Sequence, residues 1–375
     1  MKISLASIHK TSNPNLASGV PYFFYRNLKN KATVEVIDGL YKRYTLKRAV
    51  AKVLRKGIGK HFLASRLRST AKRYAKSIDS GLANSNAEIL ISLDTQLVPY
   101  LEASIPKVIY HDLTFADIVG SYPYSSGLFN SAEKEAHHVE EKALQKADHI
   151  VWTNDRALNT AKEYYGISDS KMSVIPRGAN LVKVPGEKPV KNNSTSGAIN
   201  ILFVCTDWER KGGPIVLDTV DDMRGRGIKV DLNICGVKPP RKGQPVNYNY
   251  LGRIDKSRRE DRILYRKLLK EADLFFLPTK ADAAPIAICE AQAFGIPVVA
   301  SRAGGVPTLI KNEYNGLLLE KGAKAREYAS SIIKLFDDSD LYQKLSDNAR
   351  REYEERFNWP GIIENFMDLF ENILD

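Results

Sequence analysis

Short apolar segments alternate with longer segments of mixed polarity along the first half of the chain. The short segments are rich in Ile, Val and Leu and are followed by polar or turn-forming residues. Such segments are typical of strands buried on both faces of a parallel sheet, and the segments between them are typical of the connecting helices. The predicted strands cover residues 2–8, 32–37, 89–93, 107–111, 149–153 and 172–176. This order of elements predicts an α/β domain.

The second half of the chain repeats the alternation after a polar interruption. Residues 181–198 are rich in Pro, Gly, Ser, Asn and Lys, which is the composition of a linker. Beyond them, strands are predicted at residues 199–205, 230–235, 274–277 and 296–301. Because 375 residues exceed the size of one ordinary domain, we expect two doubly wound α/β domains, at residues 1–185 and 198–358.

The overall composition is that of a globular protein, with 43% hydrophobic and 27% charged residues. The three cysteines, Cys205, Cys235 and Cys289, lie in apolar segments without the spacing of a zinc site, so they are expected to be reduced core residues. Residues 1–8 are expected to form a strand rather than a signal peptide, and no apolar run approaches the roughly eighteen residues of a membrane span. We therefore expect a cytoplasmic protein that is either soluble or peripheral on the inner membrane face.

The net charge of +12 comes from one segment of the chain. Residues 42–76 contain thirteen Lys or Arg and no Asp or Glu, so the rest of the chain is close to neutral. Apolar and basic side chains recur here at helical spacing, the apolar ones being Leu46, Ala49, Val50, Val53 and Leu54 and the basic ones Lys47, Arg48, Lys52, Arg55 and Lys56. Three interpretations stay open: contact with anionic lipid headgroups, contact with nucleic acid, and a surface helix whose apolar side packs on its own domain.

Two acidic residues, Asp282 and Glu290, are separated by seven residues in the most informative stretch of the sequence. Pro285, between them, suits the first turn of a helix, because the N–H that it lacks would have no helical partner there. The N–H groups of Ile286 and Ala287 would then lie unpaired at the positive end of the helix dipole, where a diphosphate can bind. Asp282 would precede this helix and Glu290 would lie on its second turn. The two acids would therefore flank the ligand and accept hydroxyls from two sugars.

Two neighbouring segments carry residues suited to the same ligand. Strand 296–301 runs into a turn at residues 303–305, where two glycines would allow the backbone to approach a ligand closely. Arg210 and Lys211 follow strand 199–205 and are placed to neutralise a departing diphosphate. The alternative is that they are ordinary surface cations, although the start of a helix disfavours positive charge.

The pattern of Asp282, Pro285, Glu290 and the glycine turn resembles the acid-x7-acid signature of the retaining glycosyltransferases of family 4, which belong to the glycosyl transferases group 1. Members of that family have two Rossmann-like domains that face each other across a cleft, an arrangement called GT-B. The resemblance implies the same fold here, with the nucleotide sugar bound by the C-terminal domain and the last helix, residues 360–375, returning to the N-terminal, acceptor-side domain. Asp282 stands where the family usually has Glu.

The resemblance implies roles for residues outside this signature. Lys211-Gly212 resembles the Lys-Gly pair that binds the donor phosphates in the family. Thr206 stands where the family has Arg, and Arg210 is the expected substitute. Ile254 belongs to a turn that resembles the family's Leu-Gly turn near the nucleotide base, so it is expected to bind the donor.

In the first domain the resemblance points to His111 and Gly19. His111 ends a predicted strand, as does the family histidine that contacts the donor sugar, and Asp112 is expected to orient its ring. Gly19 lies in the loop after the first strand, where the family carries a glycine-containing loop that approaches the donor or acceptor. His137 and His138 fall in a charged helical segment and are expected to be solvated.

The resemblance implies a retaining glycosyltransferase that moves a hexose from a nucleoside diphosphate sugar to a hydroxyl acceptor. Glu290 is expected to accept the ribose hydroxyls and Asp282 the hydroxyls of the donor sugar. Arg210 and Lys211 are expected to stabilise the diphosphate, so that no metal or other cofactor is required. The basic segment favours a glycan or lipid-linked acceptor, such as a precursor of lipopolysaccharide, capsule or exopolysaccharide. The alternatives are a glucosyltransferase acting on nucleic acid and a nucleotide-sugar binding protein without turnover.

Overall fold

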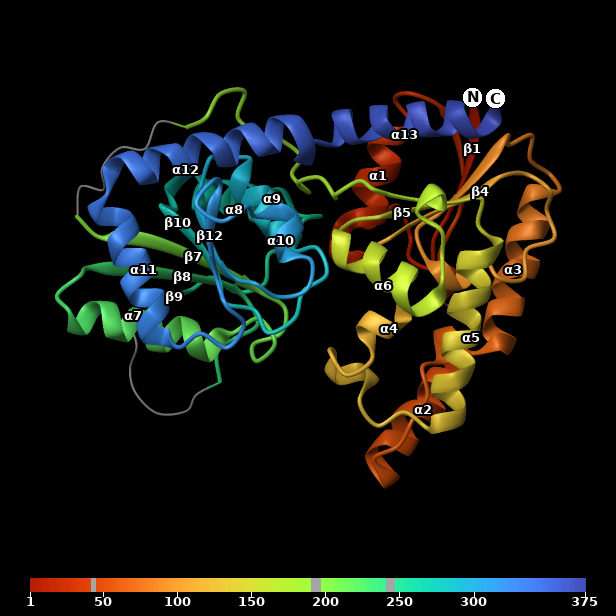
Figure 1. Ribbon diagram of the computed structural model, residues 1–375, viewed down its shortest axis with the longest axis horizontal. Coiled ribbons are helices and arrows are strands. Elements are labelled where there is room, and N and C mark those ends of the chain that lie inside the picture. The colour runs from red at the N-terminus through yellow and green to blue at the C-terminus, as the bar shows by residue number, and fades with distance from the viewer. Residues whose placement is uncertain (42–44, 190–196, 241–246) are drawn as a thin grey trace. The chain divides into compact units, whose positions relative to one another are not determined.

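The computed structural model describes residues 1–41, 45–189, 197–240 and 247–375. Its contacts divide the chain into two compact units (Figure 1). We call Met1–Pro176 with Ile362–Asp375 the first unit and Arg177–Gly361 the second unit. Two parts of the sequence-based predictions lie outside the described residues, namely 42–44 of the basic segment and 190–196 of the expected linker. Among the described residues, no helix is long and apolar enough to cross a membrane.

The first unit is built on a six-stranded sheet in the order β2-β1-β3-β4-β5-β6, in which all neighbouring strands are parallel. The strands are β1 (Lys2–Ala6), β2 (Thr33–Ile37), β3 (Ile89–Ser92), β4 (Lys107–His111), β5 (His149–Trp152) and β6 (Met172–Val174). The helices are η1 (Leu16–Gly19), α1 (Val20–Leu28), α2 (Thr45–Ile58), η3 (Ala64–Arg66), α3 (Arg68–Leu82), η4 (Thr95–Leu97), α4 (Phe115–Ile118), η5 (Pro123–Ser125), α5 (Asn130–Lys146), α6 (Asp155–Tyr165) and η6 (Asp169–Lys171). All the strands predicted for this half are confirmed.

The second unit contains a second parallel six-stranded sheet, in the order β12-β11-β10-β7-β8-β9. Its strands are β7 (Ile199–Cys205), β8 (Val230–Gly236), β9 (Asn249–Tyr250), β10 (Leu274–Leu277), β11 (Val298–Ser301) and β12 (Gly316–Leu319). Its helices are α7 (Gly213–Gly225), α8 (Arg259–Glu271), α9 (Ile286–Gln292), α10 (Val306–Leu309), α11 (Ala325–Asp337), α12 (Ser339–Glu352) and η7 (Tyr353–Phe357). The four strands predicted for this half are confirmed, whereas β9 and β12 were not predicted.

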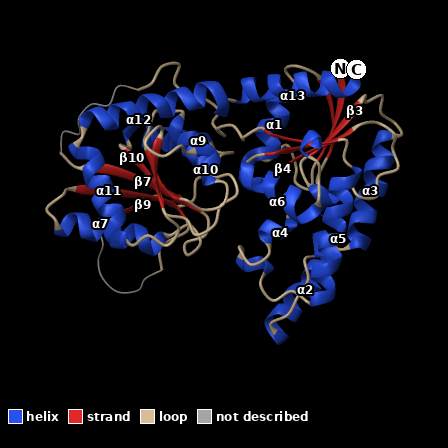
Figure 2. Ribbon diagram, in the orientation of Figure 1, coloured by secondary structure: helices blue, strands red, loops and turns tan. Residues whose placement is uncertain are grey.

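Helices flank the first sheet (Figure 2), and its strand β4 shows how both faces are buried. Successive strand residues point to opposite faces of a sheet. Ile109 therefore packs in the buried cluster that includes Tyr74 of α3, whereas Tyr110 points the other way. The ring of Tyr110 lies 4.8 Å from that of Phe366 and 5.5 Å from that of Phe24, measured between centroids. Burial on both faces explains why residues 108–110 of this strand are apolar at successive positions.

The aromatic contact of Phe366 belongs to the last helix, α13 (Trp359–Leu374), whose residues from Ile362 onward cluster with the first unit. Ile362, Phe366 and Phe370 are buried and Leu369 is half-buried. These are the residues that the sequence pattern places on one face of the helix. The apolar face of α13 therefore completes the core of the first unit.

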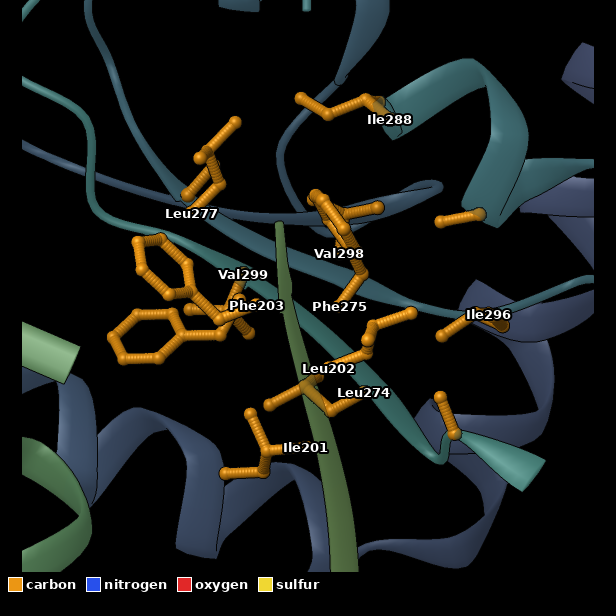
Figure 3. Packing of buried hydrophobic residues seen from close by; sticks show 14 of the residues in the cluster. Ile201, Leu202, Phe203, Leu274, Phe275, Leu277, Ile288, Ile296, Val298 and Val299 are labelled. Atoms are coloured by element: carbon orange, nitrogen blue, oxygen red, sulfur yellow. The ribbon is translucent and has the colours of Figure 1, made fainter. Parts of the chain in front are cut away.

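The core of the second unit lies between its central strands and the helices that pack on them (Figure 3). Leu202 of β7, Phe275 of β10 and Val298 of β11 are completely buried, and Ile288 of α9 lies in the same cluster. Because this core holds α9 against the sheet, it also fixes the position of the polar residues on that helix.

The three cysteines are free and buried in the second unit. Burial raises the pKa of Cys205 to about 11 and that of Cys235 to about 12, and it also raises the pKa of Cys289. All three therefore remain thiols at neutral pH, in keeping with the prediction of reduced core residues.

The prediction that both histidines of α5 are solvated is wrong for His137. Its Nδ1 lies 2.9 Å from the hydroxyl of Tyr165, and its ring stacks on Tyr164 with the centroids 5.1 Å apart. Burial lowers the pKa of His137, so the ring is neutral at pH 7. The reason is that α6 covers this side of α5, whereas His138 is exposed as expected.

A buried ionic network joins α5 to the loops after β3 and β4. Glu140 is fully buried, and its carboxylate accepts hydrogen bonds from Arg66 Nη1 at 2.5 Å and from the hydroxyl of Thr95 at 2.6 Å. The backbone N–H of Phe115 donates to the other carboxylate oxygen at 3.2 Å. One acid therefore fastens two of the loops at the carboxyl edge of the first sheet.

Replacing Glu140 by Gln should destabilise the first unit strongly, because it leaves the buried guanidinium of Arg66 without a counter-charge. We expect a loss of about 3 kcal/mol or more in the free energy of unfolding, measured by urea denaturation followed by circular dichroism. The control is Glu364→Gln, which breaks the exposed pair with Lys31 and should cost at most about 1 kcal/mol. Equal losses in the two variants would contradict a structural role for the buried network.

Candidate active site

The strand order of the second sheet reverses at β7, because β8 lies on one side of β7 and β10 on the other. In open α/β sheets, ligands bind outside the carboxyl ends of the strands at such a reversal. Arg210 and Lys211 lie in the loop that follows β7, and Asp282 lies in the loop that follows β10. Sequence segments that are far apart thus deliver two cations and one acid to the same edge of the sheet.

The predicted site residues Arg210, Lys211 and Asp282 meet in the structure. The Lys211 ammonium forms an ion pair with Oδ2 of Asp282, and Nη1 of Arg210 lies 3.9 Å from the same oxygen. The guanidinium of Arg210 also donates to the carbonyl of Ala281 at 2.7 Å. Asp282 is buried and the two cations are half-buried. Nε of Arg210 also lies 3.7 Å from Oδ2 of Asp207, so two acids balance the two cations.

Two glycines bring the neighbouring backbones onto this cluster. Gly212 has φ +83, and a Cβ there would lie 2.0 Å from the carbonyl oxygen of Pro278. Gly304 has φ +60, and its Cβ would lie 1.9 Å from the carbonyl oxygen of Asp282. The same oxygen accepts the N–H of Gly305 at 2.9 Å. The turn at residues 303–305 was predicted to approach a ligand, but in the structure its glycine packs against the protein's own backbone.

Glu290 lies on the second turn of α9, as predicted, and is buried. Its Oε1 accepts a hydrogen bond from the ammonium of Lys256 at 2.5 Å, and its Oε2 accepts one from the hydroxyl of Tyr265 at 2.7 Å. Burial, followed by the charge of Glu290, holds the pKa of Tyr265 well above its usual value, so this hydroxyl remains a donor. Both carboxylate oxygens therefore have a partner from the protein.

Lys256 also contacts the segment that enters the second unit. Its ammonium donates to the carbonyl of Asn180 at 3.3 Å, while the side-chain oxygen of Asn180 accepts the indole N–H of Trp359 at 2.9 Å. Nearby, the N–H of Ala179 donates to the carbonyl of Phe357 at 2.9 Å. The first and last segments of the second unit are thus joined beside Glu290.

Lys256 and Tyr265 are the site residues that the sequence did not predict. Lys256 lies two residues after Ile254, in a loop that was singled out only for its resemblance to a base-binding turn. Tyr265 lies on α8 and reads in the sequence as an ordinary core aromatic. The sequence could have indicated only that Glu290, if buried, needs residues that neutralise its charge and donate hydrogen bonds to it. No local pattern identifies which residues these are.

The start of α9 differs by one residue from the prediction. Pro285 lies at the N-cap with ψ 98, and the helix begins at Ile286. The N–H groups of Ile286 and Ala287 occupy the first two helical positions and so have no acceptor within the helix. The positive end of α9 therefore lies where it was predicted, although Pro285 precedes the first turn instead of forming part of it.

His111 is the last residue of β4 in the first unit. Its Nδ1 lies 2.9 Å from the carbonyl oxygen of Leu93, and because a carbonyl only accepts, Nδ1 is the donor of this hydrogen bond. Nε2 lies 3.8 Å from Oδ1 of Asp112. The hydrogen bond to Leu93 thus holds one side of the ring, and Asp112, which was predicted to orient the ring, lies on its other side.

Gly19 and Ile254 occupy positions of different character. Gly19 has φ +84 at the N-cap of α1 and follows Ala17 and Ser18, which also have positive φ. Such backbone is uncommon outside glycine and marks a sharply turned loop. Ile254 lies in the loop after β9 and packs against the core of the second unit. Among the described residues, no group of three or more His, Cys, Asp or Glu side chains is placed to hold a metal ion.

Residues 186–352 match a protein-family model described as "Glycosyl transferases group 1". The match covers most of the second unit, which is therefore similar to a group 1 glycosyl transferase domain. The predicted resemblance to this group is thereby confirmed, whereas the narrower assignment to family 4 and the roles of individual site residues stay predictions. The matched residues include Lys211, Asp282 and Glu290.

Curated relatives of the chain include two proteins named as glycosyltransferases and one named as a spore coat protein. The D-inositol 3-phosphate glycosyltransferase of Corynebacterium kroppenstedtii is 26% identical over 64% of this chain and 57% of that protein. An Escherichia coli UDP-Gal:alpha-D-GlcNAc-diphosphoundecaprenol alpha-1,3-galactosyltransferase is 27% identical over 56% of each chain. Spore coat protein SA of Bacillus subtilis is 23% identical over 80% of this chain and 82% of that protein. The chain thus spans little more than half the length of the two glycosyltransferases.

Solved structures resemble the whole chain. Sucrose-phosphate synthase from Thermosynechococcus elongatus has a TM-score of 0.71 at 16% identity and covers 100% of this chain and 99% of its own. HepE of Anabaena, solved in complex with UDP and glucose, has a TM-score of 0.66 at 17% identity. The match covers 99% of this chain and 100% of the HepE chain. These similarities confirm the predicted fold class, two Rossmann-like units of the GT-B type.

The hydroxyl of Tyr265 should contribute measurably to the stability of the second unit, because it donates to a buried carboxylate. We expect Tyr265→Phe to lower the free energy of unfolding by about 1.5–3 kcal/mol, measured by urea denaturation. The matched control is Tyr250→Phe, which removes the hydrogen bond from an exposed hydroxyl to the carbonyl of Gly236. Its cost should be smaller, and an equal cost would show that Glu290 does not depend on Tyr265.

Proposed function

We propose that this protein is a glycosyltransferase that moves a hexose, with retention of configuration, from a nucleoside diphosphate sugar to a hydroxyl acceptor. The observation that carries the proposal is the cluster of Lys211, Arg210 and Asp282 at the strand reversal of a domain that is similar to group 1 glycosyl transferases. This position suits a ligand that bears both phosphate and sugar hydroxyls. The Anabaena relative in fold was solved with UDP-glucose, which makes UDP-sugars the first donors to test.

The diphosphate is proposed to replace Asp282 as the partner of the cations. A diphosphate attracts the Lys211 ammonium and the Arg210 guanidinium more strongly than a single carboxylate does, because it carries more negative charge. The N–H groups of Ile286 and Ala287 add donors from the start of α9. Once Lys211 turns to the phosphates, the oxygens of Asp282 are available to accept hydroxyls of the donor sugar. The ion pair with Asp282 thus holds the Lys211 ammonium near the position proposed for the phosphates.

Glu290 is proposed to accept hydroxyls from the donor ribose. Each carboxylate oxygen has two lone pairs, so the bonds from Lys256 and Tyr265 leave further acceptor capacity. These two partners hold the carboxylate in one orientation, which lowers the entropy lost when the ribose binds. Ile254, two residues before Lys256, is proposed to lie against the base.

His111 and Gly19, both in the first unit, are proposed to contact the donor. Because Nδ1 of His111 donates to Leu93, its Nε2 can accept a hydroxyl of the donor sugar. Gly19 supplies a loop without a side chain that can approach the donor. As the glycosidic bond breaks, negative charge grows on the departing phosphate, and Lys211 with Arg210 stabilises it. In same-face attack, that phosphate assists removal of the acceptor proton, so the proposal requires no metal ion or other cofactor.

The acceptor is proposed to be a glycan precursor carried on a lipid, for use in lipopolysaccharide, capsule or exopolysaccharide. The Escherichia coli relative is named for a sugar on diphosphoundecaprenol, and a further structural relative, WaaG, is described as involved in lipopolysaccharide biosynthesis. The basic segment 42–76 suits the anionic surface on which such precursors are found. We accordingly propose a cytoplasmic protein that is peripheral on the inner membrane face.

Glu290→Gln should weaken donor binding, since it replaces an acceptor that carries a full charge. We expect a loss of roughly 1–3 kcal/mol, measured by calorimetry with a panel of UDP-, GDP- and ADP-sugars. Glu320→Gln, an exposed acid of the same unit, is the control and should bind as the wild type does. A Glu290→Gln variant with unchanged affinity for a donor that the wild type binds would remove Glu290 from the proposal.

Lys211→Ala should lower turnover at saturating donor by roughly a hundredfold, because charge on the departing diphosphate loses its nearest cation. Consumption of the donor in the presence of acceptor is the measurement, and Lys267→Ala, an exposed cation of α8, is the control. Unchanged turnover in Lys211→Ala would reject this role. If the wild type binds the donor but never consumes it, the protein is a nucleotide-sugar binding protein instead.

A further inference from the structure

Helix α2 carries apolar side chains on two of its sides. Ala51 is buried and Leu54 is half-buried, on the side where the helix meets η3. Leu46, Val50 and Val53 lie elsewhere on the helix and are 79%, 46% and 69% exposed. The spacing of Leu46, Val50 and Val53 places them on one face. The interpretation in which the apolar side of this helix packs entirely on its own domain is therefore wrong.

We call Leu46, Ala49, Val50 and Val53 the outer face of α2; Ala49 is also exposed. Ile58, at the end of the helix, is 62% exposed. Among the large apolar side chains that the structure describes, the three most exposed are Leu46, Val53 and Ile58. Scattered exposed apolar residues are ordinary on a protein surface, but a concentration on one helix marks an interaction surface.

Cations border the outer face of α2. Lys52 and Lys56 lie along one side of it, Arg48 and Lys60 are also exposed, and the helix contains no acid. Other cations fasten α2 to the first unit. Arg55 Nη2 donates to the carbonyl of Pro123 at 2.7 Å, and Lys47 Nζ donates to the hydroxyl of Ser69 at 2.5 Å. The helix is therefore a fixed part of the unit that presents apolar and basic groups together.

A partly exposed aromatic residue lies in η5, the segment that Arg55 of α2 contacts. The contact of Arg55 with Pro123 brings η5 to α2, and Tyr124 of η5 is 45% exposed. Its ring lies 5.5 Å from that of Tyr122. Tyr side chains favour the boundary between lipid and water, because the ring is apolar and the hydroxyl is polar. In Figure 1, α2 lies at the opposite end of the first unit from α13, so the apolar face that α13 covers is a different surface.

We propose that the outer face of α2 inserts into the headgroup region of an anionic lipid bilayer. An exposed apolar face bordered by Lys and Arg matches a membrane surface, since the apolar groups leave water and the cations meet the headgroups. Nucleic acid would account for the cations but would leave the apolar side chains without a partner. This inference rests on the membrane location in the proposed function and names the surface that contacts the membrane. It does not depend on sugar transfer.

The test is sedimentation of the full chain with vesicles of phosphatidylglycerol and phosphatidylcholine, compared with vesicles of phosphatidylcholine alone. Two triple variants test the apolar and the basic side chains separately. The serine variant carries Leu46→Ser, Val50→Ser and Val53→Ser. The Gln variant carries Arg48→Gln, Lys52→Gln and Lys56→Gln. Because all these side chains are exposed, both variants should fold normally. The matched control is Ile263→Ser with Lys267→Gln on α8, where Ile263 is 60% exposed.

The wild type and the control should bind the anionic vesicles, and each α2 variant should partition at least about tenfold more weakly. Serine variants that bind as the wild type does, or a wild type that ignores anionic vesicles, would overturn the inference. Salt-sensitive binding of duplex DNA, lost only in the Gln variant, would assign the surface to nucleic acid. Calorimetry with UDP-sugars separates the two proposals, because loss of vesicle binding alone rejects the surface and absence of donor binding alone rejects sugar transfer.

Discussion

The ion pair between Lys211 and Asp282 is the interaction on which the candidate site depends. It joins the loops after β7 and β10 where the strand order of the second sheet reverses. A buried carboxylate without a counter-charge costs several kcal/mol, so the pair keeps the two loops together. Gly212 and Gly304 permit this arrangement, because the facing carbonyl oxygens leave no space for a side chain. The ion pair and the close backbone packing thus act together to fix the positions of these two loops.

The fold was largely predictable because its central strands are buried on both faces. Such strands are apolar at successive positions, as in residues 108–110 of β4 and in all of β10. The missed strands are edge strands with weaker patterns. Strand β9 has two residues, both exposed, and β12 alternates buried and half-buried positions beginning with Gly316. At an edge, pairing depends on the neighbouring strand more than on the residues themselves.

The sequence predicted the candidate site only for residues that lie close to one another in the chain or near the start of a helix. The spacing of Asp282 and Glu290 placed both acids correctly relative to α9. Lys256 and Tyr265 escaped notice, since their contact with Glu290 arises from the packing of α8 and its preceding loop against α9. The same limit applies to His111, whose hydrogen-bond acceptor, the carbonyl of Leu93, lies at the end of a neighbouring strand. Tertiary partners of a charged or polar group have no local signature.

The position of α13 has a consequence for the order in which the protein matures. Phe366 packs against Phe24 and Tyr110, so one face of the first sheet is covered by residues that follow the whole second unit in the sequence. During translation the second unit emerges from the ribosome before α13 exists. The first unit is synthesised first, but its apolar surface stays exposed until α13 has been made. Exposed surface of this kind is what chaperones bind on nascent chains.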